Sequence, residues 1–349
     1  MLEQSDMAHY LLSLGLVKPR DVVEEDLVVV DVSRRNCVFI ASTRAGPAFV
    51  VKQAGPRSAD TLAHEAAVLR ALAELPDMAG KVPAVVHDEP AERRLVLRTP
   101  AGGRDWSDHR GRFPRIPART LGRTLADLHR LPADVLQPSP GGADRMWALS
   151  FPEPSHELML DLSAAAQDLV ARVQASRDLC HRLEQLRSAA DDDVPVHGDL
   201  RWANCLALAV PGSRRRTRLM LIDWEVAGPG PAAFDVGTVL AEYLGAWIAS
   251  IPIVDPADPG RLVTRARHPL DRMRPAVHDF WSAYRLANPL APALRRVIEL
   301  AAVRLLQAAA EHAQGLSAPS ARVVTMLQLA DNMLRHPEEA ALALLALRE

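Results

Sequence analysis

Hydrophobic residues in the first hundred positions fall mainly into short β-branched runs separated by polar turns. Such runs are typical of strands. Residues 61–75 instead have helical spacing, with apolar side chains such as Leu62 and Leu69 along one face. The pattern predicts a small lobe built on an antiparallel sheet with one main helix. The expected strands are residues 27–32, 37–41, 48–52, 82–86 and 95–97, and a short helix is expected at 7–16.

The pattern becomes helical after the stretch from Thr99 to Gly103, where proline and glycine punctuate the chain. We therefore expect an α+β chain with an N-terminal lobe at residues 1–100 and a larger, mainly helical lobe at 101–349. Two proline-rich connections, residues 132–154 and 252–275, are long for a compact domain and could cover a binding site. The expected helices are 117–131, one or two within 155–187, 236–250, 276–287, 291–314, 319–334 and 337–348.

Two short apolar runs, residues 194–196 and 219–222, interrupt the helical part, and a carboxylate follows each of them. The first leads into a His-Gly-Asp turn that ends at Asp199, with Asn204 five residues later, and the second ends directly at Asp223. A single Asp or Asn in such a place is more often a turn former. The set of three instead favours a site in which Asp199 accepts a proton from a hydroxyl group. Asn204 and Asp223 then offer oxygen ligands to Mg²⁺ that is held mainly by a nucleotide's phosphates.

Lys52 ends a buried-looking strand, and Glu65 lies thirteen residues later near the start of the expected helix. Each residue alone is most simply explained as a surface charge, the lysine reaching water through its long stem. Upstream of the Asp–Asn–Asp set, however, a lysine here can neutralise phosphate oxygens while a glutamate holds its ammonium in place.

This order of features resembles the aminoglycoside phosphotransferase and choline-kinase-like branch of the protein-kinase-like fold. The resemblance rests on the strand lysine, the helix glutamate, HGDLRWAN at 197–204 and LIDWE at 221–225, and it covers residues from about 27 to 335. It implies a bilobal kinase-like fold and a phosphotransferase that uses ATP and Mg²⁺ on a hydroxyl acceptor.

The resemblance also implies a role for individual residues. It implies Asp199 as the catalytic base, Asn204 and Asp223 as metal ligands, Lys52 on the ATP phosphates with Glu65 as its partner, Asp235 as a brace of the catalytic loop, His197 as a structural residue, and the backbone of Leu97 and Arg98 beside adenine.

Two features depart from the pattern of the family. The turn expected to cover the phosphates, Ser33 to Asn36, has no glycine, so its backbone cannot approach phosphates as a glycine-rich loop does. Ser33, Arg34 or Arg35 could substitute, and the sequence does not choose among them. The second departure is Arg201, two residues after the expected base. It could act on the charge that develops on the transferred group, or it could be a surface arginine in an arginine-rich chain.

The acceptor is less well defined than the chemistry. Residues 236–349 contain eleven Asp and Glu against twelve Arg and no Lys, so this part of the chain is not the acidic surface that a polycationic aminoglycoside would favour. The strings HGDLRWANC, LIDWEVAGPG, FDVGTVLAEYL and DPGRL resemble kinases of class V lanthipeptide and thioamitide biosynthesis. That resemblance implies a precursor-peptide Ser or Thr as acceptor and a separate lyase partner that eliminates the phosphate. A small-molecule hydroxyl kinase and a catalytically silent pseudokinase scaffold are the alternatives.

Composition indicates which binding partners and which cellular environment to expect. A formal net charge of −2 argues against a general nucleic-acid binder. Three widely spaced cysteines without a CxxC pair favour reduced thiols and a cytoplasmic protein. The most apolar long run, Val236 to Val254, contains Glu242 and is followed by further prolines, so a buried helix is expected there rather than a membrane span.

Overall fold

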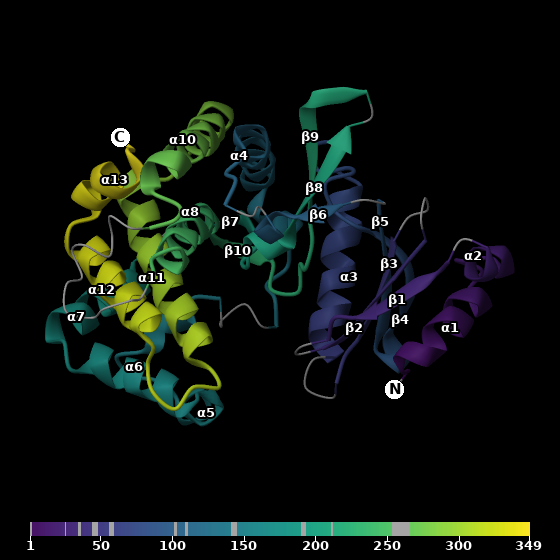
Figure 1. The fold of residues 1–349 in the computed structure, drawn as a ribbon, viewed down its shortest axis with the longest axis horizontal. Helices are drawn as coiled ribbons and strands as arrows, with labels where there is room; N and C mark the ends of the chain where they lie inside the picture. The colour runs from purple at the N-terminus through teal and green to yellow at the C-terminus, as the bar shows by residue number, and fades with distance from the viewer. Residues whose placement is uncertain are drawn as a thin grey trace.

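The protein has a small antiparallel sheet at its N-terminal end and a larger helical part (Figure 1), which confirms the predicted α+β class. The computed structural model describes the chain except residues 1, 25, 34–35, 44–47, 56–58, 101–102, 109–110, 141–144, 190–192, 211 and 253–265.

The N-terminal sheet has five strands in the order β1-β2-β3-β5-β4, and every neighbouring pair is antiparallel. One face packs on the first helix, α1, through a cluster that includes Met7, Leu11, Phe39 and Phe49. Helix α3 contributes Leu69 and Leu72 to the main core together with Leu97 of the sheet. The elements are α1 (Met7–Ser13), α2 (Pro19–Val23), β1 (Val28–Asp31), β2 (Cys37–Ser42), β3 (Ala48–Gln53), α3 (Ala59–Ala73), β4 (Ala84–Glu89) and β5 (Arg94–Thr99).

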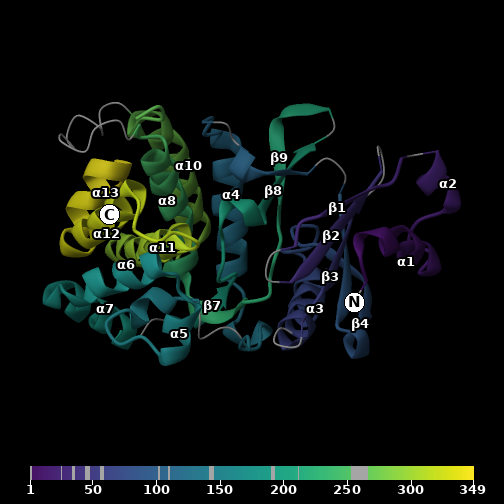
Figure 2. The same cartoon turned by 60° about the horizontal axis from the view of Figure 1, so that its bottom comes forward.

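Two small sheets connect this lobe to the helices. In Figures 1 and 2 the β8–β9 hairpin stands between α3 and the helical part. Strands β7 and β10 pair with each other, and the turn that follows β7 contains the His-Gly-Asp sequence. The strands are β6 (Arg104–Asp105), β7 (Asp193–Val196), β8 (Cys205–Val210), β9 (Ser213–Leu221) and β10 (Gly228–Pro231).

The helical part is built around α8 and α11, whose buried side chains dominate the main core. By length and composition α8 is one described helix that could cross a membrane, but 72% of that stretch is buried inside the protein. It packs as a core helix. The helices are α4 (Arg115–His129), α5 (His156–Asp161), α6 (Ala164–Gln174), α7 (Arg177–Ser188), α8 (Ala232–Ala249), α10 (Leu270–Ala287), α11 (Leu294–Ala313), α12 (Ala321–Arg335) and α13 (Pro337–Leu345).

Several details differ from the sequence-based expectation. The region expected to form one or two helices within 155–187 contains three, α5, α6 and α7. Helix α10 begins six residues earlier, at Leu270, so Pro275 lies inside the helix rather than before it. Strand β10 was not predicted, since Gly-Pro-Gly-Pro lacks strand-forming side chains. The connection at 132–154 also contains ordered turns at Ala133–Val135 and Trp147–Ser150.

Close packing of α8 on α11 gives a first prediction. A Cβ atom at Gly237 would lie 2.8 Å from the Ala301 backbone nitrogen and 2.9 Å from the Val297 carbonyl oxygen, so the two helices would have to separate. Gly237→Ala should lower the free energy of unfolding by about 1–3 kcal/mol. In Gly245→Ala, on the same helix but with nothing within 4 Å, the change should instead stabilise by up to about 1 kcal/mol. Urea unfolding compares them, and equal effects would contradict this description.

Candidate active site

The turn after β7 is shaped by a buried carboxylate at the start of α8. The backbone N–H groups of His197 and Gly198 donate to the two oxygens of Asp235, at 2.7 and 2.9 Å. Burial alone would raise the pKa of Asp235, but the hydrogen bond from His129 and the nearby imidazoles hold that pKa below its usual value. Gly198 has a φ of +81°, a conformation that favours glycine. The sequence resemblance implied Asp235 as a brace, and the structure places it in contact with this turn.

The ring of His197 joins the two chain segments that carry the acidic residues. Its Nδ1 accepts from the Asp199 backbone N–H at 3.3 Å, so Nε2 carries the proton and donates to the Ile222 carbonyl at 2.9 Å. The Ile222 N–H in turn donates to the Asn204 carbonyl at 3.0 Å. These hydrogen bonds hold the chain segments that carry Asp199, Asn204 and Asp223 next to one another. His197 moves no proton in this arrangement, because both ring nitrogens are engaged with backbone.

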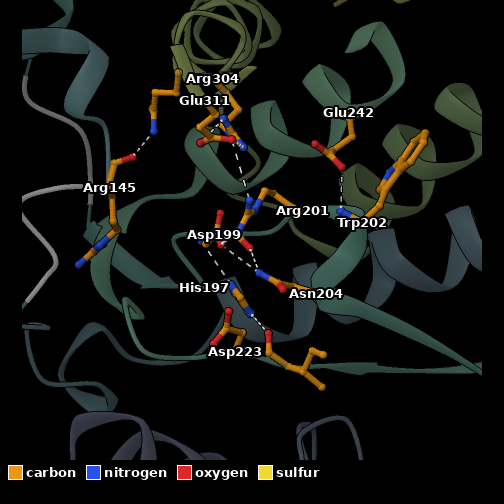
Figure 3. A network of polar contacts seen from close by, with 12 residues as sticks. Arg145, His197, Asp199, Arg201, Trp202, Asn204, Asp223, Glu242, Arg304 and Glu311 are labelled. Atoms are coloured by element: carbon orange, nitrogen blue, oxygen red, sulfur yellow. Dashed lines mark hydrogen bonds and ion pairs between the residues drawn. The ribbon is translucent and has the colours of Figure 1, made fainter. Parts of the chain in front are cut away.

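The two oxygens of Asp199 have different surroundings. Oδ2 accepts three hydrogen bonds: from Arg201 Nε at 3.1 Å, from Arg201 Nη2 at 2.9 Å and from Asn204 Nδ2 at 3.0 Å. In the described part of the chain no hydrogen bond reaches Oδ1, and the side chain is 27% exposed. Figure 3 shows the carboxylate between Arg201 and Asn204. Oδ1 is therefore the oxygen able to accept a proton from an incoming group.

Lys52 lies at the centre of a buried charge cluster that joins the two lobes. Its Nζ is 2.8 Å from both oxygens of Glu65 and 2.7 Å from Asp223 Oδ1. Burial would lower the pKa of Lys52, but the two carboxylates outweigh it and the pKa is raised. Burial likewise opposes the effect of Lys52 on Asp223, whose pKa is lowered on balance. The Lys52 ammonium and the Asp223 carboxylate are therefore charged at neutral pH.

Asp223 and Asn204 fit the predicted magnesium site. Asp223 has a φ of +68°, uncommon for a residue other than glycine, and its side chain remains 34% exposed. Asn204 uses its amide nitrogen on Asp199, which leaves its amide oxygen as the metal-binding atom. The described residues include no group of three or more His, Cys, Asp or Glu side chains suited to a metal. Two hard oxygen donors are what Mg²⁺ needs when phosphates complete its coordination.

An uncovered apolar surface lies on the Lys52 side of the sheet. Directly opposed residues share a face, and the register places Val30 opposite Ile40, and Ile40 opposite Val50, which lies two residues from Lys52. Val28 and Val30 are 52% and 47% exposed there. A flat aromatic base could pack against this face while its phosphates reach Lys52.

The other residues expected to bind the nucleotide are placed as follows. Ser33 closes its own turn, with Oγ accepting from the Val38 N–H at 3.0 Å, and Arg34 lies outside the described residues. Leu97 and Arg98 require a correction. Both lie inside β5, between β3 and β4, and these two ladders engage their backbone groups. Their backbone groups are therefore not free to meet adenine.

Several charged residues of the site were not predicted. Arg145 donates to the Pro229 carbonyl at 2.8 Å and lies so close to Gly198 that a Cβ there would be 2.6 Å from its Cδ. Glu242 accepts from the Trp202 N–H at 3.0 Å, and burial raises its pKa. Glu242 had a sequence signal, as the one acidic residue in an otherwise apolar helix after Asp235. Arg304 and Glu311, on α11, had none.

Comparison with known proteins agrees with this geometry. The phosphotransferase enzyme family matches residues 28–280. Curated protein sequences gave no match. A choline/ethanolamine kinase family protein from Mesorhizobium loti has a similar structure, with a TM-score of 0.54 and 16% identity over 96% of each chain. Plasmodium vivax ethanolamine kinase gives 0.53 and 14%, over 94% of this chain and 89% of its own. An aminoglycoside-3′-phosphotransferase of type VIII gives 0.52 and 21%, over 85% and 97%. At such identities the likeness concerns the fold.

The Lys52 cluster gives a stability prediction. Lys52→Met leaves Glu65 buried without its cation, which should lower the free energy of unfolding by about 3–5 kcal/mol. Adding Glu65→Gln should restore part of that loss, because the uncompensated carboxylate is gone. The control is Lys81→Met: Lys81 pairs with Asp127 where both side chains are more exposed, so about 1 kcal/mol or less is expected. Urea unfolding of the wild type, Lys52→Met, Glu65→Gln, the double variant and Lys81→Met measures the coupling. Losses from Lys52→Met and Glu65→Gln that simply add would contradict the assignment.

Proposed function

The chain belongs to the phosphotransferase enzyme family, and we propose that it transfers the γ-phosphoryl group of ATP, with Mg²⁺, to an alcohol oxygen held against Asp199. The observation that carries this proposal is the convergence of Asp199, Asn204 and Asp223 at one rim, with the Lys52 ammonium on Asp223. Phosphoryl transfer needs positioning and charge neutralisation more than covalent chemistry, and these residues supply both.

The residues divide the work between the two reactants. Asp199 accepts the proton of the alcohol at Oδ1, the oxygen that is not committed to Arg201 and Asn204. Lys52 stays on Glu65 and exchanges Asp223 for phosphate oxygens, which frees the Asp223 carboxylate for the metal. Bound Mg·ATP supplies the transferred group and the neutralising cation. The exposed valines of β1 lie on the face that an adenine ring would cover.

For the acceptor, we infer the Ser or Thr hydroxyl of a ribosomally made precursor peptide, with a separate lyase acting afterwards. The charges around Asp199 support this choice. Arg201 and Arg304 are matched by Glu242 and Glu311, so the surroundings of the base are balanced rather than acidic. A neutral hydroxyl on a peptide suits such surroundings better than a polycation does. The short strings shared with class V lanthipeptide and thioamitide kinases point the same way.

A small-molecule alcohol is the second candidate. The structural neighbours named for choline, ethanolamine and aminoglycoside substrates share the fold at low identity. Glu311, with its side chain 39% exposed, could meet an amine of such a substrate. A pseudokinase scaffold is the weakest reading, because every residue needed for the chemistry is present.

Two substitutions separate chemistry from nucleotide binding. Asp199→Asn removes the proton acceptor and should lower turnover by about 10²-fold or more, with Mg·ATP affinity retained. Asp223→Asn should abolish the Mg²⁺-dependent part of that affinity. Isothermal titration with ATP, with and without Mg²⁺, measures binding, and phosphate release measures turnover. Loss of nucleotide binding in Asp199→Asn, or unchanged Mg²⁺ dependence in Asp223→Asn, would contradict the assigned roles.

The acceptor is tested by mass spectrometry. The protein is incubated with ATP, Mg²⁺ and a Ser/Thr-rich precursor peptide encoded beside its own gene, and a phosphate-sized mass gain on a Ser or Thr is expected. The same peptide with those residues changed to Ala, and the Asp199→Asn protein, are the controls. If the peptide remains unmodified while an aminoglycoside or choline gains phosphate, the peptide proposal is wrong and the second candidate stands.

A further inference from the structure

Arg201 lies between the expected base and a second carboxylate from a distant helix. Its Nε and Nη2 both donate to Asp199 Oδ2, and its Nη1 forms a long ion pair of 3.9 Å with Glu311 Oε2, too long for a hydrogen bond. Burial would lower the pKa of Arg201, but the surrounding carboxylates raise it. Arg201 is thus held from two sides, unlike a surface arginine that extends into water.

Glu311 is itself held in place by a buried arginine about two turns earlier on α11. Arg304 is 4% exposed; its Nη1 is 3.1 Å from Glu311 Oε1, and its Nη2 donates to Oε2 at 3.2 Å. Gln307, on the same face of α11, donates to the Arg145 carbonyl at 2.9 Å. The face of α11 that lies near the turn at residues 197–201 is therefore polar, although most side chains of the helix are buried in the core (Figure 3).

We propose that Glu311 and Arg304 are positioning residues that act on Asp199 through Arg201. Arg304 holds Glu311, Glu311 holds one side of the Arg201 guanidinium, and the other side of that guanidinium fixes Asp199 Oδ2. With Oδ2 engaged, rotation of the carboxylate is restrained and Oδ1 stays turned toward the acceptor. The inference rests on the proposed function, in which Asp199 is the base.

The contacts of Arg304 and Glu311 explain why a mostly buried helix can carry two charged side chains. A buried arginine is costly unless it is paired, so Arg304 without Glu311 would destabilise α11. Glu311 reaches outward from this helix to Arg201, and an ion pair that joins α11 to the catalytic turn restricts Arg201 to one geometry. Positioning of this kind matters because small displacements of a catalytic group slow the reaction strongly.

The test uses the complete chain and ATP hydrolysis, with water as the acceptor, so that no natural substrate is required. Glu311→Gln should lower turnover by about 10-fold, leave Mg·ATP affinity unchanged, and be partly rescued by Glu311→Asp. The matched control is Glu299→Gln, which breaks an Arg–Glu pair with Arg295 on the same helix and should leave turnover unchanged.

A double-substitution cycle identifies the route of the effect. If Glu311 acts only through Arg201, the Glu311→Gln/Arg201→Lys protein should be no slower than Arg201→Lys alone. Independent, multiplying effects would overturn the inference, as would wild-type turnover in Glu311→Gln. If the Asp199→Asn variant hydrolysed ATP as fast as the wild type, that result would overturn the proposed function, and this inference with it.

A second measurement does not depend on activity. The Nε–H group of Arg201, identified by the disappearance of its ¹H–¹⁵N signal in Arg201→Lys, should be protected from solvent exchange in the wild-type protein. In Glu311→Gln the exchange should become faster, because one side of the guanidinium is released. Equal exchange in both proteins would show that Glu311 does not hold Arg201.

Discussion

A buried ammonium shared by two carboxylates is the interaction on which the rest of this site depends. Lys52 comes from the sheet, Glu65 from α3 and Asp223 from the segment after β9, so a single cation joins three elements of two lobes. A charge this well buried is tolerated only when its partners are in place. Lys52 contacts Asp223 Oδ1, an oxygen of the carboxylate proposed to bind the metal. Under the proposed function, binding of Mg·ATP would exchange this partner of Lys52 for phosphate oxygens.

The turn at residues 197–199 is fixed by a separate set of contacts. Asp235 accepts a hydrogen bond from the backbone of the turn, and His197 links the turn to Ile222. Arg201 restrains the carboxylate of Asp199. The two groups of contacts meet where Ile222 leads into Asp223. As a result Asp199 and Asp223 cannot move independently, which under the proposed function would keep the proton acceptor aligned with the phosphoryl donor.

The sequence predicted the parts of this site that depend on local order. Strand ends, the spacing from Asp199 to Asn204, and the lysine at the end of β3 all follow from short patterns in the chain. It did not predict Arg145, which lies in a proline- and glycine-rich connection, or Glu311, which reaches the turn only because α11 packs on α8. It also placed the adenine-facing backbone at Leu97 and Arg98, whose backbone groups are engaged by strand pairing on both sides of β5. Contacts made by packing leave no periodic signal.

The most direct test is a crystal structure with Mg²⁺ and a non-hydrolysable ATP analogue. The Lys52 Nζ should remain on Glu65 but leave Asp223 for phosphate oxygens, and Asp223 and Asn204 should each place an oxygen on the metal. A nucleotide bound elsewhere, with the ion pair between Lys52 and Asp223 unchanged, would contradict this account.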